Sequence, residues 1–255
     1  MYAVLLAAGY ATRLYPLTKD RPKPLLPVGG RPIIDYLVDR LDAAPEITRM
    51  VLVTNARFRA AFQEWSAGRR TRAPIEVLDD GSTCNEDRLG AVADFRLAVQ
   101  HADAPGESAY VLATDNLPRF DLLDIIGFSA ERGSSAVFAC RTNPERLKRV
   151  GVALLDGEGR IVDFEEKPER PKSDLRVPPF YVYTPQAVRL VSGFLDEGNN
   201  PDAPGHFLSW LCAREPVYAL RRAEGTYDIG TLATYHAVCA EFGAGGHGTE
   251  GPGRR

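Results

Sequence analysis

A glycine turn followed by basic residues stands close to the start of the sequence, in the stretch AAGYATRLYPLTKDRPKPLLPVGG at 7–30. The turn comes directly after an apolar run at 3–6, and Arg13 and Lys23 stand in the loop behind it. A glycine turn at the end of a strand offers backbone amides to an anion, and nearby cations neutralise its charge. The stretch therefore predicts a site for a phosphate-rich ligand.

Two common phosphate-binding motifs do not fit this stretch. A Walker A loop requires GxxxxGK[ST], and no lysine stands at the required place. A dinucleotide fingerprint requires GxGxxG at the start of a helix, but here a proline-rich loop of about twenty residues intervenes. The remaining interpretation is a glycine-containing loop whose amides meet a triphosphate, with Arg13 and Lys23 reaching the same phosphates.

Two aspartates at the ends of extended runs are candidates for metal binding. Asp115 closes the run AYVLATDN, and Asp228 stands in TYDIGT after another extended run. Carboxylates at the carboxyl edge of a parallel sheet suit a hard, oxygen-liking ion such as Mg²⁺. Each aspartate has an alternative role as a helix cap, for segments that start near Pro118 and near Thr231. We favour the metal role for both.

Apolar runs alternate with amphipathic segments between residues 2 and 141, which predicts repeated strand–helix units. Such alternation is typical of an α/β fold, and it predicts a Rossmann-like, mostly parallel mixed sheet flanked by helices on both faces. After residue 148 the pattern becomes richer in strands, beginning with a hairpin at 149–168 that turns at Asp-Gly-Glu-Gly. The final segment, 243–255, has no apolar cluster to bury and predicts a disordered tail.

The overall composition excludes several classes of protein. Hydrophobic residues make up 44% of the 255 residues, the formal net charge is −3, and basic residues are dispersed, so no nucleic-acid surface is expected. No apolar run is long enough to span a bilayer, and the N-terminus lacks signal-peptide features, so a cytoplasmic protein without a membrane partner is expected. The helices carry no pattern that defines the number of subunits. The cysteines form no CxxC pair: Cys84, Cys140, Cys212 and Cys239.

The opening stretch resembles the signature LAAGxGTRLxPLTxxxPKPLLPV of the sugar-1-phosphate nucleotidylyltransferases, or nucleotide-sugar pyrophosphorylases, of the glucose-1-phosphate thymidylyltransferase type. The chain reads LAAGYATRLYPLTKDRPKPLLPV, and later landmarks follow in the family's order. The resemblance implies one nucleotidyltransferase domain at 1–242, with 1–118 mainly nucleotide-binding and 119–242 mainly binding the sugar phosphate. It also implies an Mg²⁺-dependent reaction of an NTP with a sugar 1-phosphate that gives an NDP-sugar and pyrophosphate.

The resemblance assigns roles to particular residues. Arg13 and Lys23 would be the catalytic cations, with arginine on the leaving pyrophosphate and lysine near the α-phosphate. Asp115 corresponds to the aspartate of the family's GD element, with Thr114 in place of the glycine, and Asp228 matches the WxDxGT element; both would hold Mg²⁺. The expected nucleotide-binding residues are Leu6, Ala8, Gly9, Ala11, Thr12, Asn85 and Gly90.

The sugar side of the site is expected at the FEEKP element. By resemblance, Lys167 would contact the sugar phosphate and Glu166 would accept hydrogen bonds from sugar hydroxyls, because a hydroxyl-rich ring needs acceptors and its phosphate needs a cation. Gly151 corresponds to the glycine of the family's YGV element, whose backbone lies near the sugar.

The sequence departs from the family pattern at two places. Ala11 replaces the second glycine of the signature, which restricts positive φ; we expect the loop to survive, with loss of triphosphate binding as the alternative. The run NEDR departs from the common patterns before Gly90, so the choice of base stays open. Transfer to a non-sugar phosphate of the phosphocholine or phosphonate type, a glycosyltransferase and a non-catalytic nucleotide-sugar sensor are the competing functions.

Overall fold

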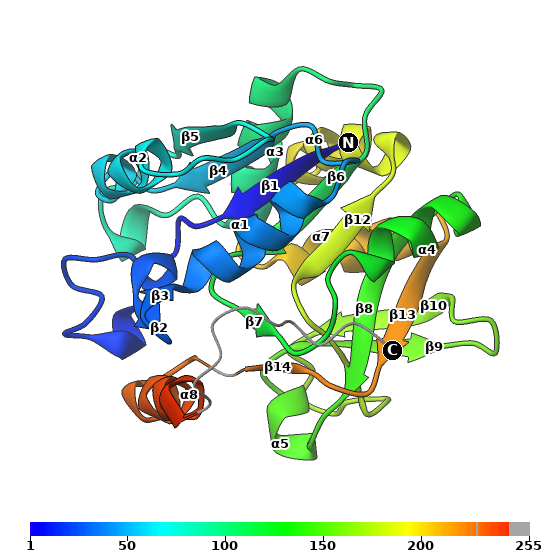
Figure 1. Cartoon of the computed structure of the whole chain (residues 1–255). Coiled ribbons are helices and arrows are strands. Elements are labelled where there is room, and N and C mark those ends of the chain that lie inside the picture. Colours follow the sequence, from blue (N-terminus) through cyan, green and yellow to red (C-terminus); the bar gives the residue numbers. More distant parts are fainter. Residues whose placement is uncertain (228, 245–255) are drawn as a thin grey trace.

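A ten-stranded mixed sheet forms the centre of the protein (Figure 1). The computed structural model describes residues 1–227 and 229–244. The strands of the sheet are β1 (Tyr2–Leu6), β4 (Met50–Thr54), β5 (Ile75–Asp79), β6 (Ala109–Ala113), β8 (Ser135–Arg141), β9 (Gly151–Leu155), β10 (Ile161–Glu166), β11 (Leu175–Val177), β12 (Phe180–Tyr183) and β13 (Val217–Arg222). Their order is β10-β9-β11-β8-β12-β6-β1-β4-β5, and β13 pairs with β8.

The strands of the first half run parallel. β1 lies parallel to β4 and to β6, and β4 lies parallel to β5. β12 is antiparallel to both β6 and β8, and β9 and β10 form the antiparallel hairpin expected from the Asp-Gly turn. The predicted mostly parallel mixed sheet with a strand-rich second half is therefore confirmed.

Helices cover both faces of the sheet. The helices are α1 (Ile33–Ala43), α2 (Arg59–Ala67), α3 (Ala91–Ala102), α4 (Asp124–Arg132), α5 (Pro144–Leu147), α6 (Pro185–Asp196), α7 (Pro204–Cys212) and α8 (Leu232–Ala244). From β1, Tyr2, Val4 and Leu6 pack in the core with α3, α6 and α7, whereas Ala3 and Leu5 pack with α1, α2 and α4. Because side chains alternate between the faces of a strand, β1 supplies two cores at once.

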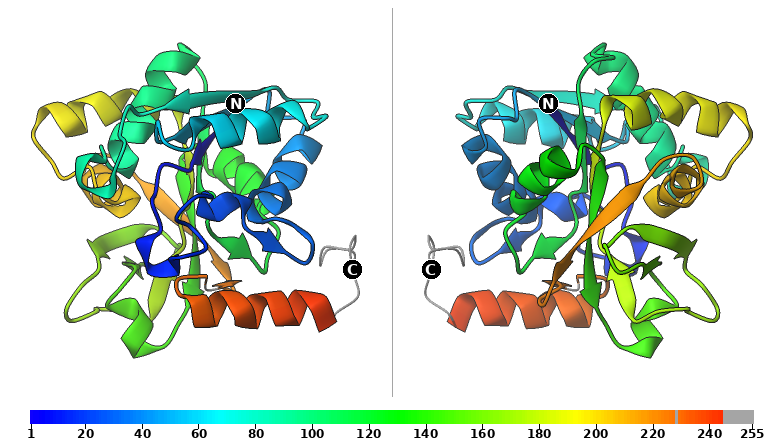
Figure 2. Two further views of the ribbon diagram at one scale, coloured as in Figure 1. Left: turned by 90° about the vertical axis from the view of Figure 1, so that its left-hand side faces the viewer. Right: turned by 90° about the vertical axis from the view of Figure 1, so that its right-hand side faces the viewer.

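A third, smaller core holds the C-terminal helix. Residues of α8 pack against β2 (Pro27–Val28), which pairs with β3 (Arg31–Pro32), and Figure 2 shows α8 along one edge of the molecule. The hydroxyl of Tyr235 donates to the carbonyl oxygen of Pro27 at 2.7 Å. The proline-rich loop that carries the predicted phosphate-binding cations is thus held in place by α8. None of the helices in the described part of the chain is both long and apolar enough to cross a membrane.

Short elements around the strand ends differ from the sequence prediction. Three 3₁₀ turns, α5 and two small sheets were not predicted: η1 (Thr12–Leu14), η2 (Lys23–Leu25), η3 (Asn85–Asp87), β2 with β3, and β7 (Leu117–Pro118) with β14 (Thr226–Tyr227). The alternative role of Asp115 as a helix cap is wrong, because β7 follows it and α4 begins only at Asp124. Asp228 and residues 245–255, part of the predicted tail, lie outside the described residues.

Candidate active site

A cleft of about 1020 Å³ lies at the carboxyl ends of the parallel strands. It runs from the loop after β1, past the end of β6, to the ends of β10 and β11. Open α/β sheets bind ligands at this edge. Every predicted site residue that the structure describes lines the cleft: Leu6, Ala8, Gly9, Ala11, Thr12, Arg13, Lys23, Asn85, Gly90, Asp115, Gly151, Glu166 and Lys167.

The glycine loop is held in shape by two side chains. The amide of Asn55, which is fully buried, donates to the carbonyl oxygen of Ala8 at 2.9 Å, and the Thr18 hydroxyl donates to that of Ala11 at 2.8 Å. Ala11 has φ 47° and ψ 44°, the left-handed conformation that glycine adopts freely. An alanine in this conformation costs about 1–2 kcal/mol. The loop therefore forms as expected, and Ala11 stores strain directly before η1.

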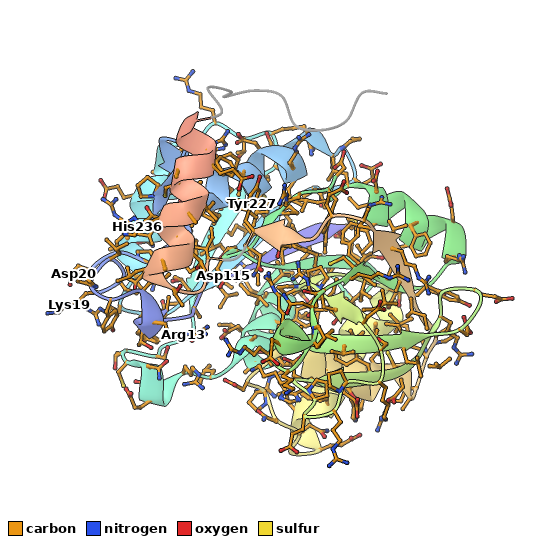
Figure 3. All side chains as sticks on the ribbon, turned by 90° about the horizontal axis from the view of Figure 1, so that it is seen from below. Arg13, Lys19, Asp20, Asp115, Tyr227 and His236 are labelled. Atoms are coloured by element: carbon orange, nitrogen blue, oxygen red, sulfur yellow. The ribbon has the colours of Figure 1, made fainter. Side chains whose placement is uncertain are left out.

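Lys23 and Asp115 form an ion pair on the floor of the cleft. Lys23 Nζ lies 2.8 Å from Asp115 Oδ2, and the Asn116 amide donates to Asp115 Oδ1 at 2.6 Å. The Lys23 side chain is 9% exposed, whereas that of Asp115 is 44% exposed. Burial raises the pKa of Asp115, but the Lys23 ammonium and the hydrogen bonds outweigh that effect and hold this pKa below its ordinary value. Asp115 is therefore a carboxylate at neutral pH. In Figure 3, Arg13 lies near the start of α8, and Asp115 lies nearer the middle of the view.

Thr114, which replaces a family glycine, joins the ends of β1 and β6. Its hydroxyl and its backbone amide both donate to the carbonyl oxygen of Leu6, at 2.8 and 3.1 Å, and the side chain is fully buried. The replacement therefore adds a hydrogen bond between the two strands that carry the glycine loop and Asp115.

The donor set at this end of the cleft suits a hard divalent cation that also binds phosphate. Asp115 supplies a carboxylate with an exposed face. Among residues 1–227 and 229–244 no group of three or more His, Cys, Asp or Glu side chains could enclose a metal ion. Mg²⁺ is typically bound by one or two carboxylates, with substrate phosphates completing its shell. Ile229, Gly230 and Thr231 also line the cleft. One or two protein carboxylates, with phosphate oxygens from a substrate, would therefore fit Mg²⁺ at this place.

Another part of the cleft is built around Glu166. A Cβ on Gly205 would lie 1.9 Å from Glu166 Oε2, and one on Gly151 would lie 3.1 Å from it, so both glycines make room for this carboxyl group. Burial raises the pKa of Glu166, and the neighbouring Lys167 ammonium opposes the shift. Lys167 has φ 51°, a left-handed conformation that is strained for a residue with a side chain.

The part of the cleft at Gly90 contains a close contact between two segments that are far apart in sequence. The amides of Ala91 and Val92, at the start of α3, donate to the carbonyl oxygens of Asp202 and Pro201 at 3.3 and 2.9 Å. A Cβ on Gly90 would lie 2.6 Å from the Pro201 oxygen, and Gly90 has φ 97°. The approach of the 201–202 backbone therefore requires a glycine here, a reason different from the nucleotide-binding role expected for Gly90.

Comparisons with known proteins agree with this geometry. A family model described as nucleotidyl transferase matches residues 2–243. The chain belongs to this family. The family predicted from the opening stretch is therefore confirmed.

Among the relatives, a glucose-1-phosphate adenylyltransferase of Thermotoga neapolitana is 29% identical over 251 residues, which cover 91% of this chain and 58% of the relative. The chain thus spans little more than half of that protein. A UTP–glucose-1-phosphate uridylyltransferase of Haloferax volcanii is 31% identical over 187 residues, or 72% of each chain. A crystal structure of UDP-glucose pyrophosphorylase with UDP-glucose shares the fold, with a TM-score of 0.79, 22% identity and coverage of 95% of this chain and 98% of that one.

Several residues of the cleft were not predicted from the sequence. They are Asp80, Asp94, Asn143, Arg146, Arg149, Arg176 and, against Glu166, Gly205. Arg176 is 4% exposed and donates to the Thr226 hydroxyl at 3.1 Å. An arginine in an apolar strand, and a glycine in the first turn of a helix, are each unfavourable on local grounds. These two unfavourable placements, of Arg176 and of Gly205, were the features of the sequence that could have indicated a functional role.

Replacing Gly90 with alanine is expected to lower the free energy of unfolding by about 3 kcal/mol or more, through the contact with Pro201 and the positive φ. Thermal unfolding measures the effect. Gly127→Ala in α4 is the matched control, because no atom outside its own helix lies within 4 Å of the added Cβ. Equal melting temperatures for the two variants would show that the 201–202 backbone does not restrict position 90.

The stability of the protein is expected to fall as pH rises from the ordinary aspartate pKa to about 8, because Asp94 keeps its proton over this range only in the folded state. Asp94 is 5% exposed, and burial together with the Asp80 carboxylate raises its pKa to about 8. The folded state therefore binds this proton more tightly than the unfolded state does, so the stabilisation is complete below the ordinary aspartate pKa and is lost as pH rises through 8. The slope is about 1.4 kcal/mol per pH unit within that window.

Asp94→Asn replaces the titrating carboxyl group with an amide, and so removes the dependence of stability on pH that Asp94 causes. The melting temperature of the variant, relative to the parent protein, should therefore rise between pH 4 and pH 8 and become constant above that range. Asp79→Asn is the matched control. Asp79 stands directly before Asp80 in the sequence, and its carboxylate accepts a hydrogen bond from Arg59. The same pH profile in both variants would contradict the assignment to Asp94.

Proposed function

We propose that the protein joins an NTP to a sugar 1-phosphate and releases an NDP-sugar and pyrophosphate. The observation that supports this most directly is the single cleft that combines the loop of Arg13 and Lys23, the Asp115 carboxylate and the Glu166–Lys167 pair. These groups match a reaction between two phosphate-bearing substrates, one of which also carries hydroxyl groups. The chain covers only part of some relatives, so the reaction is proposed for this cleft and not for a longer protein.

The proposed reaction needs no nucleophile from the protein. A phosphate oxygen of the sugar 1-phosphate forms a bond to the α-phosphorus, the bond from that phosphorus to the bridging oxygen breaks, and pyrophosphate leaves with the electron pair. The protein accelerates such a transfer by positioning the reactants and neutralising charge. Amides of the glycine loop and Arg13 would hold the leaving pyrophosphate, and Lys23 would contact the α-phosphate.

Asp115 and Asp228 would hold Mg²⁺. When bound, the ion neutralises charge on the phosphates and aligns them. Asp115 is suited to this task because its carboxylate is ionised at neutral pH and its side chain is open to the cleft.

Glu166 and Lys167 would bind the sugar 1-phosphate. The carboxyl group of Glu166 accepts hydrogen bonds from ring hydroxyls, and the Lys167 ammonium contacts the phosphate. Gly151 and Gly205 support this role because they leave space for the Glu166 carboxyl group between β9 and α7. The strained backbone of Lys167 resembles that of many residues at ligand sites.

Pyrophosphate release in the presence of Mg²⁺ tests the proposal. Each of ATP, GTP, CTP, UTP and dTTP is combined with a panel of sugar 1-phosphates, and with phosphocholine and a phosphonate in place of the sugar. Release that requires one nucleotide and one sugar 1-phosphate together is the expected result. Release with phosphocholine or the phosphonate alone would identify a non-sugar acceptor, and nucleotide binding without release from any pair would indicate a sensor.

A further inference from the structure

A short segment that leads into α7, residues 201–205, contacts two separate parts of the cleft. At one end Gly205, in the first turn of α7, lies against the carboxyl group of Glu166, which is proposed to bind the sugar. At the other end the 201–202 backbone packs on Gly90, which belongs to the proposed base end of the cleft. The segment therefore joins the two sides on which the proposed substrates would bind.

The contact with Glu166 leaves no room for a side chain at position 205. A Cβ on Gly205 would lie 1.9 Å from Oε2 and 2.9 Å from Cδ of Glu166, and 3.1 Å from the ring of Phe164. The Glu166 side chain is 11% exposed, and its other oxygen, Oε1, lies 4.0 Å from Lys167 Nζ. The backbone of Gly205 thus limits the place of this carboxyl group on one side, and the Lys167 ammonium lies on the other.

Backbone hydrogen bonds and an ion pair hold the segment against the start of α3. The amides of Ala91 and Val92 donate to the carbonyl oxygens of Asp202 and Pro201. The Arg88 guanidinium donates twice to Asp202 Oδ1, from Nε at 3.1 Å and from Nη2 at 3.0 Å. Asp202 itself does not line the cleft, so it acts on a bound substrate only through its neighbours.

The segment is short and stiff, so its position is passed on to Glu166. Only Ala203 and Pro204 separate Asp202 from Gly205. Ala203 is 7% exposed, and the ring of Pro204 fixes its own φ. Closely packed interiors are hardly compressible and transmit a displacement to the neighbouring groups. A shift at position 202 therefore moves Gly205 and, with it, the carboxyl group of Glu166.

We propose that Asp202 and Gly205 are positioning residues for the acceptor substrate. Gly205 sets the place of the Glu166 carboxyl group, and Asp202 keeps Gly205 there through Arg88 and the start of α3. This inference rests on the proposed function, because it concerns the acceptor side of the same cleft. Asp202 thus controls the affinity for the acceptor more than the affinity for the nucleotide, although it is bonded to the proposed base end.

Asp202→Asn tests the inference. Asparagine keeps the shape of the side chain and removes its charge, so the ion pair with Arg88 weakens while the backbone hydrogen bonds remain. The KM of the sugar 1-phosphate is expected to rise about threefold or more, in line with the loss of one partly exposed ion pair, with less than about a twofold change in kcat and in the KM of the nucleotide.

Asp196→Asn is the matched control, because Asp196 pairs with Arg96 of α3 at 3.6 Å and neither residue lines the cleft. An unchanged acceptor KM in Asp202→Asn, an equal rise in the control, or an equal rise in the KM of the nucleotide overturns the inference.

A direct effect of the Asp202 charge has the opposite sign. Burial raises the pKa of Glu166, and the Asp202 carboxylate adds to this shift. Removing that carboxylate would by charge alone favour the anionic acceptor and the ionised form of Glu166, so the acceptor would bind more tightly. A displaced carboxyl group weakens binding at every pH. The ratio of the acceptor KM values of variant and parent is therefore measured from pH 6 to pH 9, and a ratio of one or less at the alkaline end overturns positioning.

Gly205→Ala tests the second positioning residue. The added methyl group displaces the Glu166 carboxyl group, so the acceptor KM should rise about tenfold or more. Glu166→Asp withdraws that carboxyl group by one methylene, so it should cost much less in the Gly205→Ala background than in the parent protein. Additive effects in this double-mutant cycle overturn the inference.

Gly193→Ala in α6 is the control for Gly205→Ala, because no atom outside its own helix lies within 4 Å of the added Cβ. A rise of the acceptor KM in Gly193→Ala equal to that in Gly205→Ala overturns the assignment to position 205. Asp202→Asn decides the matter if Gly205→Ala does not fold.

Failure of the inference can be distinguished from failure of the proposed function. Calorimetry gives the Kd of glucose 1-phosphate for the parent and the variants without any nucleotide. Pyrophosphate release from a sugar 1-phosphate whose KM is unaltered in Asp202→Asn and in Gly205→Ala would overturn positioning and leave the reaction standing. Weaker binding of glucose 1-phosphate by both variants, with no release with any nucleotide, would support positioning and contradict the reaction.

Discussion

Replacing Lys23 with methionine is expected to lower kcat about 100- to 1000-fold, equivalent to about 2.7–4 kcal/mol of transition-state stabilisation. The Lys23 ammonium lies 2.8 Å from Asp115 and its side chain is 9% exposed, so its charge acts in a partly desolvated place beside the proposed reacting phosphate. Charge in such a site is worth more than charge in water, because less solvent screens it. Steady-state kinetics with the preferred substrates measures the effect.

The fold should tolerate this change. Methionine keeps the packing of the aliphatic stem, and Asp115, at 44% exposure, retains contact with solvent when the ammonium is lost. The melting temperature should therefore change little. Lys172→Met is the control: Lys172 contacts Asp163 at 2.6 Å in an exposed ion pair and does not line the cleft. A large loss of stability with a proportionate loss of kcat would instead define Lys23 as a structural residue.

The parts of the protein that the sequence predicted well are encoded in contiguous stretches. The runs of β1, β4 and β6 are almost completely buried on both faces, and such strands are recognisable because nearly every residue is apolar. The glycine loop and both cations were found because they share one stretch of 24 residues at 7–30, whose order is itself the signal.

The parts that escaped prediction depend on contacts between distant segments. Gly205 is required by Glu166, and Asp94 has its special environment because α3 brings it against Asp80. The sequence shows each of these residues without its partner, and each then resembles an ordinary loop or helix residue. Gly90 was predicted as a site residue for a different reason, because the backbone that packs on it is more than 100 residues away, at Pro201.

This difference explains why the reaction class was predictable while the choice of base was not. The proposed phosphate site lies in one continuous loop, which a local pattern describes. The proposed base end is assembled from the end of β5, the start of α3 and the 201–202 backbone. Charge and hydrogen bonding at that end are properties of the assembly, and the fold had to be known before they could be read.

Replacing Asp115 with asparagine is expected to reduce turnover about 1000-fold or more while the protein stays folded. An amide oxygen is a weaker ligand than a carboxylate for a hard cation, and metal-assisted phosphoryl chemistry depends on several kcal/mol of charge stabilisation. The change also leaves Lys23 beside a neutral group, so two charges of the proposed site are disturbed at once. Kinetics across a range of Mg²⁺ concentrations, together with Mg²⁺-dependent thermal stabilisation in the presence of nucleotide, measure the effect.

The matched control for this variant is Asp163→Asn, which changes the carboxylate of the Lys172–Asp163 pair on the β9–β10 hairpin, where it does not line the cleft. Both variants remove one charge from an ion pair that solvent partly screens, so their effects on stability should be similar and small. Only Asp115→Asn should lose turnover and the Mg²⁺-dependent stabilisation. Near-parental activity in Asp115→Asn would remove Asp115 from the proposed metal site, and the role of its carboxylate would then be to orient the Lys23 ammonium.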